Sequence, residues 1–397
     1  MFAGPPGTLY DDSMTLQTIP PQNFSAAAGL YIHIPFCVKK CSYCAFYSST
    51  SISLVPDFLQ ALFKEMEITG HKFGPFDTLY IGGGTPSILR PQHLGEILKR
   101  VHSHFDLQSG AEITLEANPG DLDRPFLREL VALGFNRLNV GVQSFDGKVL
   151  QFFGRRHSSE EAVSAVEHSR RAGFRNLGLD LIYGIPGQSM ESWLASLARA
   201  VALGPEHLSC YQLSVEKNTP LEEELARGKF SLPGEGQQYD FFMNTAEFLE
   251  NSGYLHYEVS NFARGIKYFS RHNQKYWDHT PYLGLGPAAH SFLGGQRWWN
   301  YPTLHPYLSE IKQGRSPIQA TEILTPEELR FETIFLGLRT RKGIHLKDLL
   351  QNHKYDLLAE KKGLLTRLQQ EGMLTLEDDH LYPTRAGLAV ADRLALM

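Results

Sequence analysis

From residue 30 to about residue 216, short apolar runs alternate with longer amphipathic stretches. The short runs are rich in β-forming residues and lie at Leu30–Pro35, Thr78–Ile81, Ile113–Asn118, Arg137–Ser144, Asn176–Tyr183 and His207–Val215. The stretches between them have helical spacing and cover 56–69, 91–104, 124–133, 159–172 and 191–203. Such alternation predicts parallel strands joined by right-handed helical crossovers. The six units therefore predict an α/β fold with an open, partial (β/α)6 barrel.

Within the predicted strands, polar and apolar side chains alternate with a period of two. Leu30 and Ile32 share one face of the first strand, while Tyr31 and His33 share the other. The same alternation places on one face of the third to sixth strands the residues Thr114, Glu116, Asn118, Asn139, Gly141, Gln143, Gly178, Asp180, Gln212 and Ser214. Parallel strands covered on both faces should be apolar on both, and a solvent-exposed antiparallel sheet disagrees with the helical crossovers. We therefore expect a polar lumen that holds a ligand at the carboxyl ends of the strands.

The rest of the chain divides into a tail and two further segments. Residues 1–29 are rich in Pro, Ser, Gly and Ala and are interpreted as a mobile N-terminal tail, and residues 30–253 as the barrel with an additional helix at 235–250. Residues 254–301 are aromatic and glycine-rich without clear periodicity. Residues 302–397 are predicted to form a mostly helical C-terminal domain. Its helices near 345–352 and 357–371, followed by a turn between short apolar runs, resemble a winged helix.

Charge and composition exclude several classes of protein. The net charge of −5 and the absence of a basic stripe in the C-terminal domain argue against nucleic-acid binding. No apolar run approaches the roughly 20 residues of a membrane-spanning helix. Residues 1–29 contain no Lys or Arg and no apolar core segment, which argues against a secretory or transit peptide. We expect a cytoplasmic protein without an integral membrane segment, and peripheral contact with a membrane stays open.

Three of the four cysteines, Cys37, Cys41 and Cys44, form a C-x-x-x-C-x-x-C pattern directly after the first predicted strand. Disulfides inside so short a loop would be strained, whereas clustered thiolates suit iron–sulfur clusters. Three thiolates can hold three irons of a [4Fe–4S] cube and leave the fourth iron open to a chelating small molecule. Zinc with His33 as a fourth ligand is the alternative. Cys210 stands apart and is interpreted as a buried residue of the sixth strand.

Polar residues at the ends of neighbouring strands predict a small-molecule site beside this loop. Gly82–Gly84 end the second strand, and glycines allow a ligand to approach the backbone closely. Glu116, Gln143 and Asp180 lie on the polar faces of strands three to five, where they can bind hydroxyl and amino groups. Arg155 follows the fourth strand and can pair with a ligand carboxylate.

The cysteine motif after the first strand of a (β/α) series resembles that of the radical S-adenosylmethionine (SAM) superfamily. The resemblance implies a [4Fe–4S] cluster on Cys37, Cys41 and Cys44, with SAM on the open iron. An electron that a donor delivers to the cluster can then cleave the sulfonium bond of SAM. The resemblance also implies SAM contacts, with Gly83, Gly84 and Thr85 at the methionine end and the remaining ligands being Tyr31, Tyr43, Glu116, Gln143, Arg155 and Asp180.

Longer blocks resemble the HemN/HemW family of oxygen-independent coproporphyrinogen III oxidase-like proteins, and within it the heme chaperones of the HemW group. These blocks are 180–187, 211–216, 257–262, 272–277 and 282–290, and the fourth reads H-N-x-x-Y-W. The coproporphyrinogen dehydrogenases of the family resemble C-x-x-x-C-x-x-C-x-C and have a longer N-terminal extension. In this chain Phe46 stands at the position of the last cysteine.

The HemW resemblance implies that the protein binds heme and transfers it to an acceptor protein, and no catalytic residue is assigned. The predicted heme residues are His272, Tyr276 and Trp277, because imidazole can ligate heme iron and aromatic rings can cover a porphyrin. His33, His256 and His290 are further candidate ligands. Two alternatives remain, namely anaerobic decarboxylation of coproporphyrinogen III and a HemN-like radical SAM methyltransferase that uses a second SAM.

Overall fold

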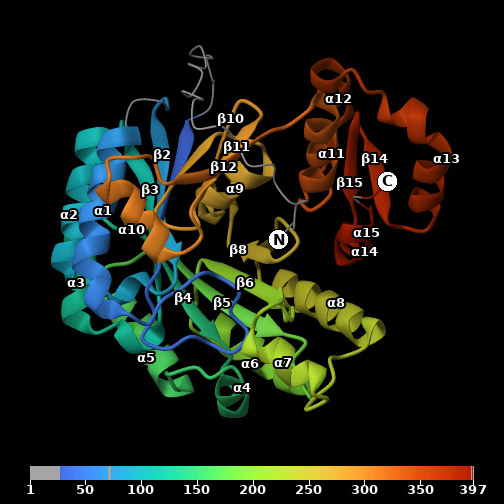
Figure 1. Ribbon diagram of the computed structural model, residues 1–397. Helices are drawn as coiled ribbons and strands as arrows, with labels where there is room; N and C mark the ends of the chain where they lie inside the picture. Colours follow the sequence, from blue (N-terminus) through green and yellow to red (C-terminus); the bar gives the residue numbers. More distant parts are fainter. Residues whose placement is uncertain (1–26, 70–72, 395, 397) are drawn as a thin grey trace.

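The computed structural model describes residues 27–69, 73–394 and 396, and its largest element is a twelve-stranded sheet (Figure 1). The strands follow the order β12-β11-β10-β9-β1-β2-β3-β4-β5-β6-β8-β7. Their bounds are β1 Ala28–Ile34, β2 Phe76–Gly83, β3 Leu107–Ala117, β4 Arg137–Gln143, β5 Leu177–Tyr183, β6 His207–Gln212, β7 Leu255–His256, β8 Asn261–Ala263, β9 Tyr282–Leu285, β10 His290–Leu293, β11 Gln296–Asn300 and β12 Ile318–Ile323. The predicted mobile tail falls mostly on residues 1–26, which lie outside the described residues.

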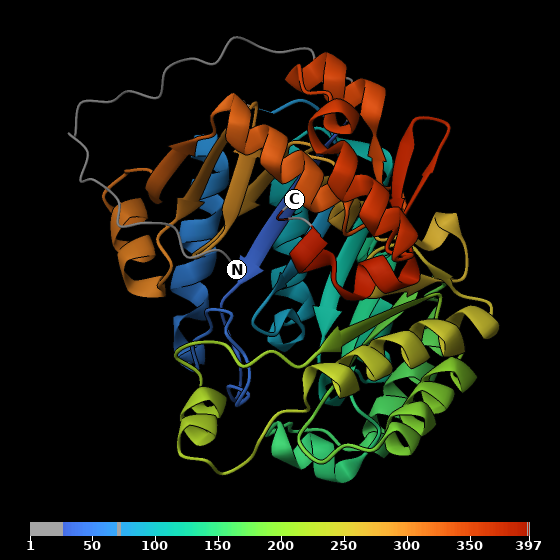
Figure 2. The ribbon, with the colours of Figure 1, turned by 90° about the vertical axis from the view of Figure 1, so that its right-hand side faces the viewer.

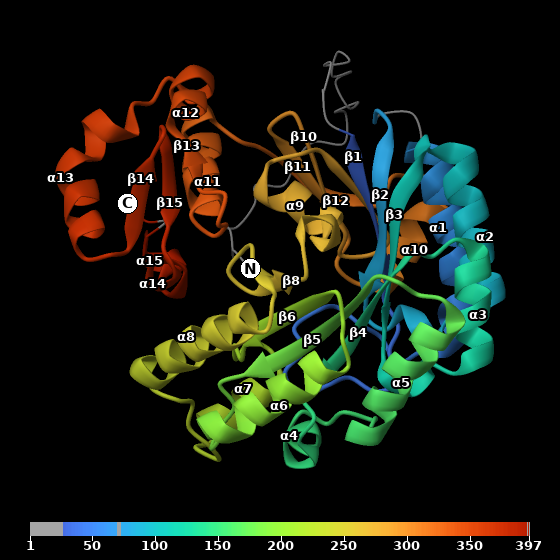
Figure 3. The ribbon, with the colours of Figure 1, turned by 180° about the vertical axis from the view of Figure 1, so that it is seen from behind.

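Strands β1 to β6 are parallel neighbours, as predicted, and a helix follows each of the first five. These crossover helices are α1 Val55–Thr69, α2 Pro91–His104, α3 Arg124–Leu133, α5 Ser159–Ala172 and α6 Met190–Ala202. They line the outer side of the sheet, where Leu30, Ile32 and Ile34 of β1 are fully buried (Figure 3). Because β6 pairs with β8 and β1 pairs with β9, the barrel stays open and the partial (β/α)6 prediction is confirmed.

Local signals in the sequence set the ends of these helices. The N-cap of helix α3 is Asp123, whose carboxylate accepts a hydrogen bond from the amide of Phe126. Its C-cap is Gly134, whose backbone lies in the left-handed region. Helix α5 begins with a capping box of Ser158 and Glu161. Such caps satisfy amide groups that have no partner inside the helix, so each crossover begins and ends where the next strand can rejoin the sheet.

In the sixth strand, the predicted polar face is wrong. Asp180 of β5, which faces the lumen, is level with Ser209 of β6. Residues alternate along a strand, so His207, Ser209 and Tyr211 line the lumen. The strand ends at Gln212, and Ser214 lies beyond it with its hydroxyl bonded to Glu216 at 2.8 Å. The apolar pattern at 213–215 therefore belongs to a loop that packs on a small neighbouring core.

The aromatic segment 254–301, which has no clear periodicity, extends the sheet at both ends instead of forming a body of its own. Strand β9 pairs in parallel with β1, and β10 and β11 follow as antiparallel strands. Strands β7 and β8 continue the other end beyond β6. Between β8 and β9, helix α9 (Arg271–Trp277) lies on the inner side of the sheet, which Figures 1 and 3 both show. These strands are too short for a period of two to stand out in the sequence.

Residues after the sheet form a second unit with its own core (Figure 2). Helix α10 (Leu304–Lys312) packs on α1 and β12 pairs with β11, so the second unit starts later than the predicted boundary at 302. It contains helices α11 (Pro326–Gly337), α12 (Leu346–His353) and α13 (Leu357–Gln370), the short helices α14 (Arg385–Ala389) and α15 (Ala391–Leu394), and a small sheet in the order β13-β15-β14. Its strands are β13 Ile344–His345, β14 Leu374–Glu377 and β15 His380–Pro383, so helices dominate and a two-stranded wing follows α13.

One buried carboxylate joins the sheet extension to the barrel. Glu65 of α1 is 2% exposed and accepts three hydrogen bonds from distant segments. These bonds come from the amide of Gly286 at 2.8 Å, the side-chain amide of Asn300 at 2.5 Å and the hydroxyl of Tyr307 at 2.7 Å. Burial raises the pKa of Glu65 to about 7, although these donors favour the charged form.

Replacing Glu65 with Gln should lower the stability of the protein. The amide has one acceptor oxygen where the carboxylate has two, so at least one buried donor loses its partner. We expect the free energy of unfolding to fall by about 1–3 kcal/mol in urea denaturation. Glu67→Gln on the same helix removes an exposed carboxylate paired with Lys64, and should change it by less than about 0.5 kcal/mol. Equal stability of the two variants would contradict this role of Glu65.

Candidate functional site

The cysteine loop leaves the carboxyl end of β1 and is fixed on both sides. The amide of Cys37 donates to the carbonyl of Ser49 at 3.0 Å, which brings the start of the loop beside its end. The amide of Ser42 donates to Phe153 at 3.3 Å, and the amide of Cys44 to Cys41 at 3.3 Å. All four cysteines are free thiols. The backbone therefore brings Cys37, Cys41 and Cys44 together at the carboxyl end of the parallel strands.

Cys37 and Cys41 have polar or charged neighbours, whereas burial raises the pKa of the Cys44 thiol. The hydroxyl of Thr85 lies 3.2 Å from the sulfur of Cys37, and Arg155 donates to the sulfur of Cys41 at 3.4 Å. A guanidinium group stabilises a neighbouring thiolate. By contrast, Cys210 is buried in the core, where desolvation and the charge of Asp180 raise its pKa. Its environment is that of a structural residue.

The zinc alternative conflicts with the position of His33. One ring nitrogen lies 3.1 Å from the hydroxyl of Tyr31 and the other 3.0 Å from the carbonyl of Tyr47. Both nitrogens are therefore engaged. Within the part of the chain that the structure describes, no group of three or more His, Cys, Asp or Glu residues is arranged to hold one metal ion. Three thiols on three separate irons of a cube do not need to converge on one point, so these residues fit a cluster.

The glycine turn after β2 lies against the base of the cysteine loop. The amide of Gly84 donates to Ile34 and that of Thr85 to Phe36, both at 2.8 Å. A Cβ atom at position 84 would lie 2.6 Å from the carbonyl oxygen of Phe36, and Gly83 has φ +110°. Only glycine permits this close packing, which holds the turn directly beside the start of the cysteine loop.

Two buried carboxylates lie next to this turn in the lumen. Glu116 accepts from the hydroxyl of Tyr80 at 2.7 Å and from the amide of Gly83 at 3.1 Å. Asp180 accepts from the side chain of Asn139 at 2.6 Å, and its other oxygen has no partner. Burial raises the pKa of Glu116 to about 7 and that of Asp180 to about 6. An unpartnered buried carboxylate oxygen fits a ligand that brings its own donors, such as the hydroxyl or amino groups of SAM.

Gln143 and Arg155 meet above Gly141. Gln143 has φ +66° at an irregularity in the β4–β5 register, which turns its side chain out of the regular alternation. Arg155 donates to the carbonyl of Gly141 at 2.7 Å, while its buried Nε has no partner. A free guanidinium N–H fits a carboxylate ligand. These two residues and the carboxylates thus surround the region in front of the cysteine loop.

The two predicted tyrosine ligands lie on opposite sides of the loop. Tyr31 faces the lumen with its ring centre 6.2 Å from that of Tyr80. Tyr43 lies within the loop and packs on Phe153 at 4.6 Å. Burial raises the pKa of both phenols, so each acts as a neutral hydrogen-bonding group.

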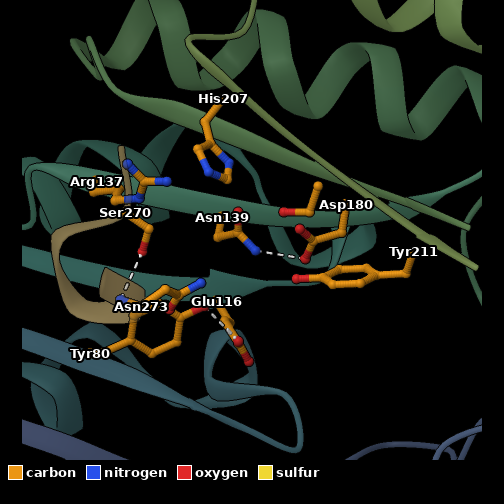
Figure 4. A pocket seen from close by; sticks show the side chains of 10 residues that line it. Tyr80, Glu116, Arg137, Asn139, Asp180, His207, Tyr211, Ser270 and Asn273 are labelled. Atoms are coloured by element: carbon orange, nitrogen blue, oxygen red, sulfur yellow. Dashed lines mark hydrogen bonds between the residues drawn. The ribbon is translucent and has the colours of Figure 1, made fainter. Parts of the chain in front are cut away.

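A small cavity of about 40 Å³ lies beside the two carboxylates. Figure 4 shows the side chains that line it. Sequence alternation pointed to Glu116, Asn139 and Asp180, but it missed the rest of the lining. The further lining residues are Tyr80, Arg137, His207, Ser209, Tyr211, Ser270 and Asn273. Tyr80 lies on the lumen face of β2 by the same period of two, so the sequence pattern could have predicted it. Ser270 and Asn273 come from α9, which no local pattern places near the lumen.

The predicted heme residues lie on α9. His272 is 1% exposed, and its ring nitrogens lie 2.8 Å from the hydroxyl of Thr78 and 2.9 Å from that of Tyr276. Burial lowers the pKa of His272 to about 3. Trp277 is partly buried, and its indole N–H has no partner. The structure brings the three side chains to one short helix, with the imidazole turned into the lumen.

Comparison with known proteins agrees with this geometry. Residues 31–200 match the model of the radical SAM superfamily and residues 324–390 that of the HemN C-terminal domain. The chain is 34% identical to the heme chaperone HemW of Bacillus subtilis, over 90% of this chain and 95% of the relative. It is 36% identical to the HemW of Synechocystis, over 83% and 82%. The solved structure of coproporphyrinogen III oxidase (HemN) from Escherichia coli superposes with a TM-score of 0.81 at 26% identity, covering 93% of this chain and 89% of that one.

Membership of the radical SAM superfamily implies a [4Fe–4S] cluster and SAM. When both are bound, they supply one-electron cleavage of the sulfonium bond. In this chain, Cys37, Cys41 and Cys44 would hold the cluster. Glu116, Gln143, Arg155 and Asp180 would orient SAM beside it.

Alanine at Cys37, Cys41 or Cys44 should abolish cluster binding, because each thiolate would hold one iron. Iron and sulfide per chain after anaerobic reconstitution measure this. Cys210→Ala is the matched control and should retain a full cluster, since that thiol is buried in the core. A Cys210→Ala protein that folds but lacks iron would contradict the assignment of Cys37, Cys41 and Cys44 as the cluster ligands.

Alanine at Asp180 should weaken SAM binding about 10–100-fold, as expected for the loss of one buried charged hydrogen bond. Calorimetry on the cluster-loaded protein measures the affinity. Asp146→Ala is the control, because Asp146 caps α4 (Gly147–Phe152) on the outside of the barrel. If Asp180→Ala binds SAM with wild-type affinity, Asp180 has a structural role and does not bind SAM.

Proposed function

Because the chain belongs to the HemW family of heme chaperones within the radical SAM superfamily, we propose that it binds heme and transfers it to an acceptor protein. The observation that carries this proposal is similarity to HemW relatives along almost the whole chain, at higher identity than to HemN. In the proposed cycle the protein carries a [4Fe–4S] cluster with exchangeable SAM, and an electron donor reduces the cluster.

Phe46, two residues after the cluster motif, supports a chaperone over a decarboxylase. Phe46 occupies the position at which the resemblance to coproporphyrinogen dehydrogenases requires another cysteine, and its ring is 58% exposed. An exposed phenyl group at the mouth of the barrel offers an apolar surface in place of a thiol. HemN shares the fold, so fold alone does not separate the two functions.

The proposed partners are heme, the acceptor protein and the electron donor. Among the described residues, no helix is long and apolar enough to cross a membrane. The proposed functional division is a barrel at 30–253, an aromatic segment at 254–301 that extends the sheet of the barrel, and a C-terminal domain that begins after β12. Tyr276 and Trp277 remain predicted heme contacts. Ligation of heme iron by His272 would have to break a hydrogen bond to Thr78 or Tyr276, which disfavours His272 as the axial ligand.

Stoichiometric protein should shift the Soret band of heme, and the reduced, cluster-loaded protein should not oxidise coproporphyrinogen III. The reason for the heme binding is the similarity to HemW heme chaperones, and the reason for the absent oxidation is the missing thiol at Phe46. The measurement is anaerobic incubation with SAM and coproporphyrinogen III, followed by detection of CO₂ and protoporphyrinogen. HemN under the same conditions is the positive control. Catalytic formation of both products would replace the chaperone with the decarboxylase.

A further inference from the structure

An exposed imidazole and an indole lie side by side on the concave face of the sheet extension. Tyr31, which faces the lumen, is level with Gly284 of β9. Tyr282 lies on the same face of β9 as Gly284, and it pairs with Phe292 of β10. His290 is two residues before Phe292 in β10, so it also faces the lumen. His290 pairs with Trp299 of β11, and their rings stack at 5.6 Å with planes 26° apart.

The pair has a small neighbour on one side. Ala320 of β12, level with Trp299, has a single methyl group, whereas the carbonyl of His290 and the methyl group of Ala289 fill the space above Gly284. His290 is exposed, and no hydrogen bond engages its ring among the described residues. Partial desolvation of the ring and the nearby charge of Arg297 lower the pKa of His290, which favours the neutral imidazole. A neutral, open imidazole beside an indole matches what heme iron and a porphyrin edge require.

The other three candidate histidines are buried and engaged. His33 is bonded through both ring nitrogens. His256 stacks on Phe262 at 4.2 Å, and its Nε2 lies 3.4 Å from the carbonyl of Val259. His272 has a hydroxyl at each nitrogen. Access to iron therefore separates His290 from the rest.

Helix α9 is clamped to the amino ends of β1 to β3. Lys275 lies 2.6 Å from Asp77 and donates to the carbonyl of Ala27 at 2.6 Å. Arg271 pairs with the same aspartate at 2.9 Å. A Cβ atom at Gly29 would lie 3.0 Å from the ring of His272, so glycine in β1 permits this close approach. The imidazole is thus held rigidly inside the lumen.

From His272 a chain of contacts leads to the SAM site. Its ring stacks on that of Tyr80 at 5.2 Å with planes 30° apart. The hydroxyl of Tyr80 donates to Glu116 at 2.7 Å, and Glu116 also binds the amide of Gly83 in the glycine turn. Packing of the imidazole therefore fixes the ring whose hydroxyl orients the carboxylate.

We propose that His290, with Trp299 beside it, binds the heme iron, and that His272 is a positioning residue which holds Glu116 for SAM through Tyr80. The first half deepens the proposed chaperone function and rests on it. The second half concerns SAM alone and rests on different contacts. The H-N-x-x-Y-W block then lies at the amino end of the lumen and acts on the SAM site through Tyr80, and heme occupies the open face that carries His290.

The test uses the cluster-loaded full chain and two readouts, heme titration at the Soret band and SAM calorimetry. His290→Ala should weaken heme binding at least about tenfold and keep wild-type SAM affinity.

His272→Ala should keep the heme spectrum and weaken SAM binding about tenfold, as expected for a misoriented buried hydrogen bond. His272→Phe, which retains a flat ring on Tyr80, should restore most of the SAM affinity. His256→Ala is the matched buried control and should change neither readout.

The variant Tyr80→Phe distinguishes the positioning role of His272 from a general loss of structure. The groups that face Glu116 are Tyr31, Tyr80, Asp180 and Tyr276, and the Tyr80 bond lowers the pKa of Glu116. Tyr80→Phe should therefore move the pH midpoint of SAM binding upward relative to wild type, while the titration of SAM itself is common to both proteins.

Each half has an outcome that overturns it. A wild-type heme spectrum and affinity in His290→Ala refute the heme ligand. Wild-type SAM affinity in His272→Ala, or an unshifted pH midpoint in Tyr80→Phe, refutes the positioning role. If the wild-type chain itself fails to bind heme, the proposed chaperone function falls, and the SAM result still decides the second half.

Discussion

The parallel pairing of β1 with β2 is the constraint on which the site depends. Its register brings Ile34 beside Gly83, so the chain leaving β1 and the chain leaving β2 emerge together. Backbone bonds from Gly84 and Thr85 then fasten the glycine turn under the cysteine loop. A shift of one residue would turn every lumen side chain outward and separate the turn from the thiols. The cluster loop and the SAM-facing backbone are therefore one unit, set by a single strand pair.

Burial of ionisable groups gives the lumen its chemical character. Glu116 and Asp180 are removed from water with few donors around them, so their charged forms are disfavoured until a ligand supplies hydrogen bonds. Three protein donors satisfy Glu65, and Tyr80 and Gly83 donate to the two oxygens of Glu116. Of these three carboxylates, Asp180 alone keeps an oxygen without a partner. Burial raises the pKa of all three, although only Glu116 and Asp180 lie in the site.

The likeness to HemN shows how one fold can carry two chemistries. The barrel, the cysteine loop and the glycine turn form a common support. The position that separates this chain from the dehydrogenase pattern is Phe46, which is exposed. Surface residues of this kind change the ligand without disturbing the sheet, because they contribute little to the core.

The sequence by itself determined the cysteine motif, the crossover helices and the lumen face of the third to fifth strands, because each is a local pattern of spacing or period. It misread the sixth strand, since a loop after Gln212 carried the same alternation as a strand. Only the tertiary structure decided the environment of His272, whose partner Thr78 lies 194 residues away in the chain. The same holds for Glu65 and for His290, because contacts between distant segments leave no period in the sequence. Whether an imidazole is packed or open to a ligand depends on those contacts.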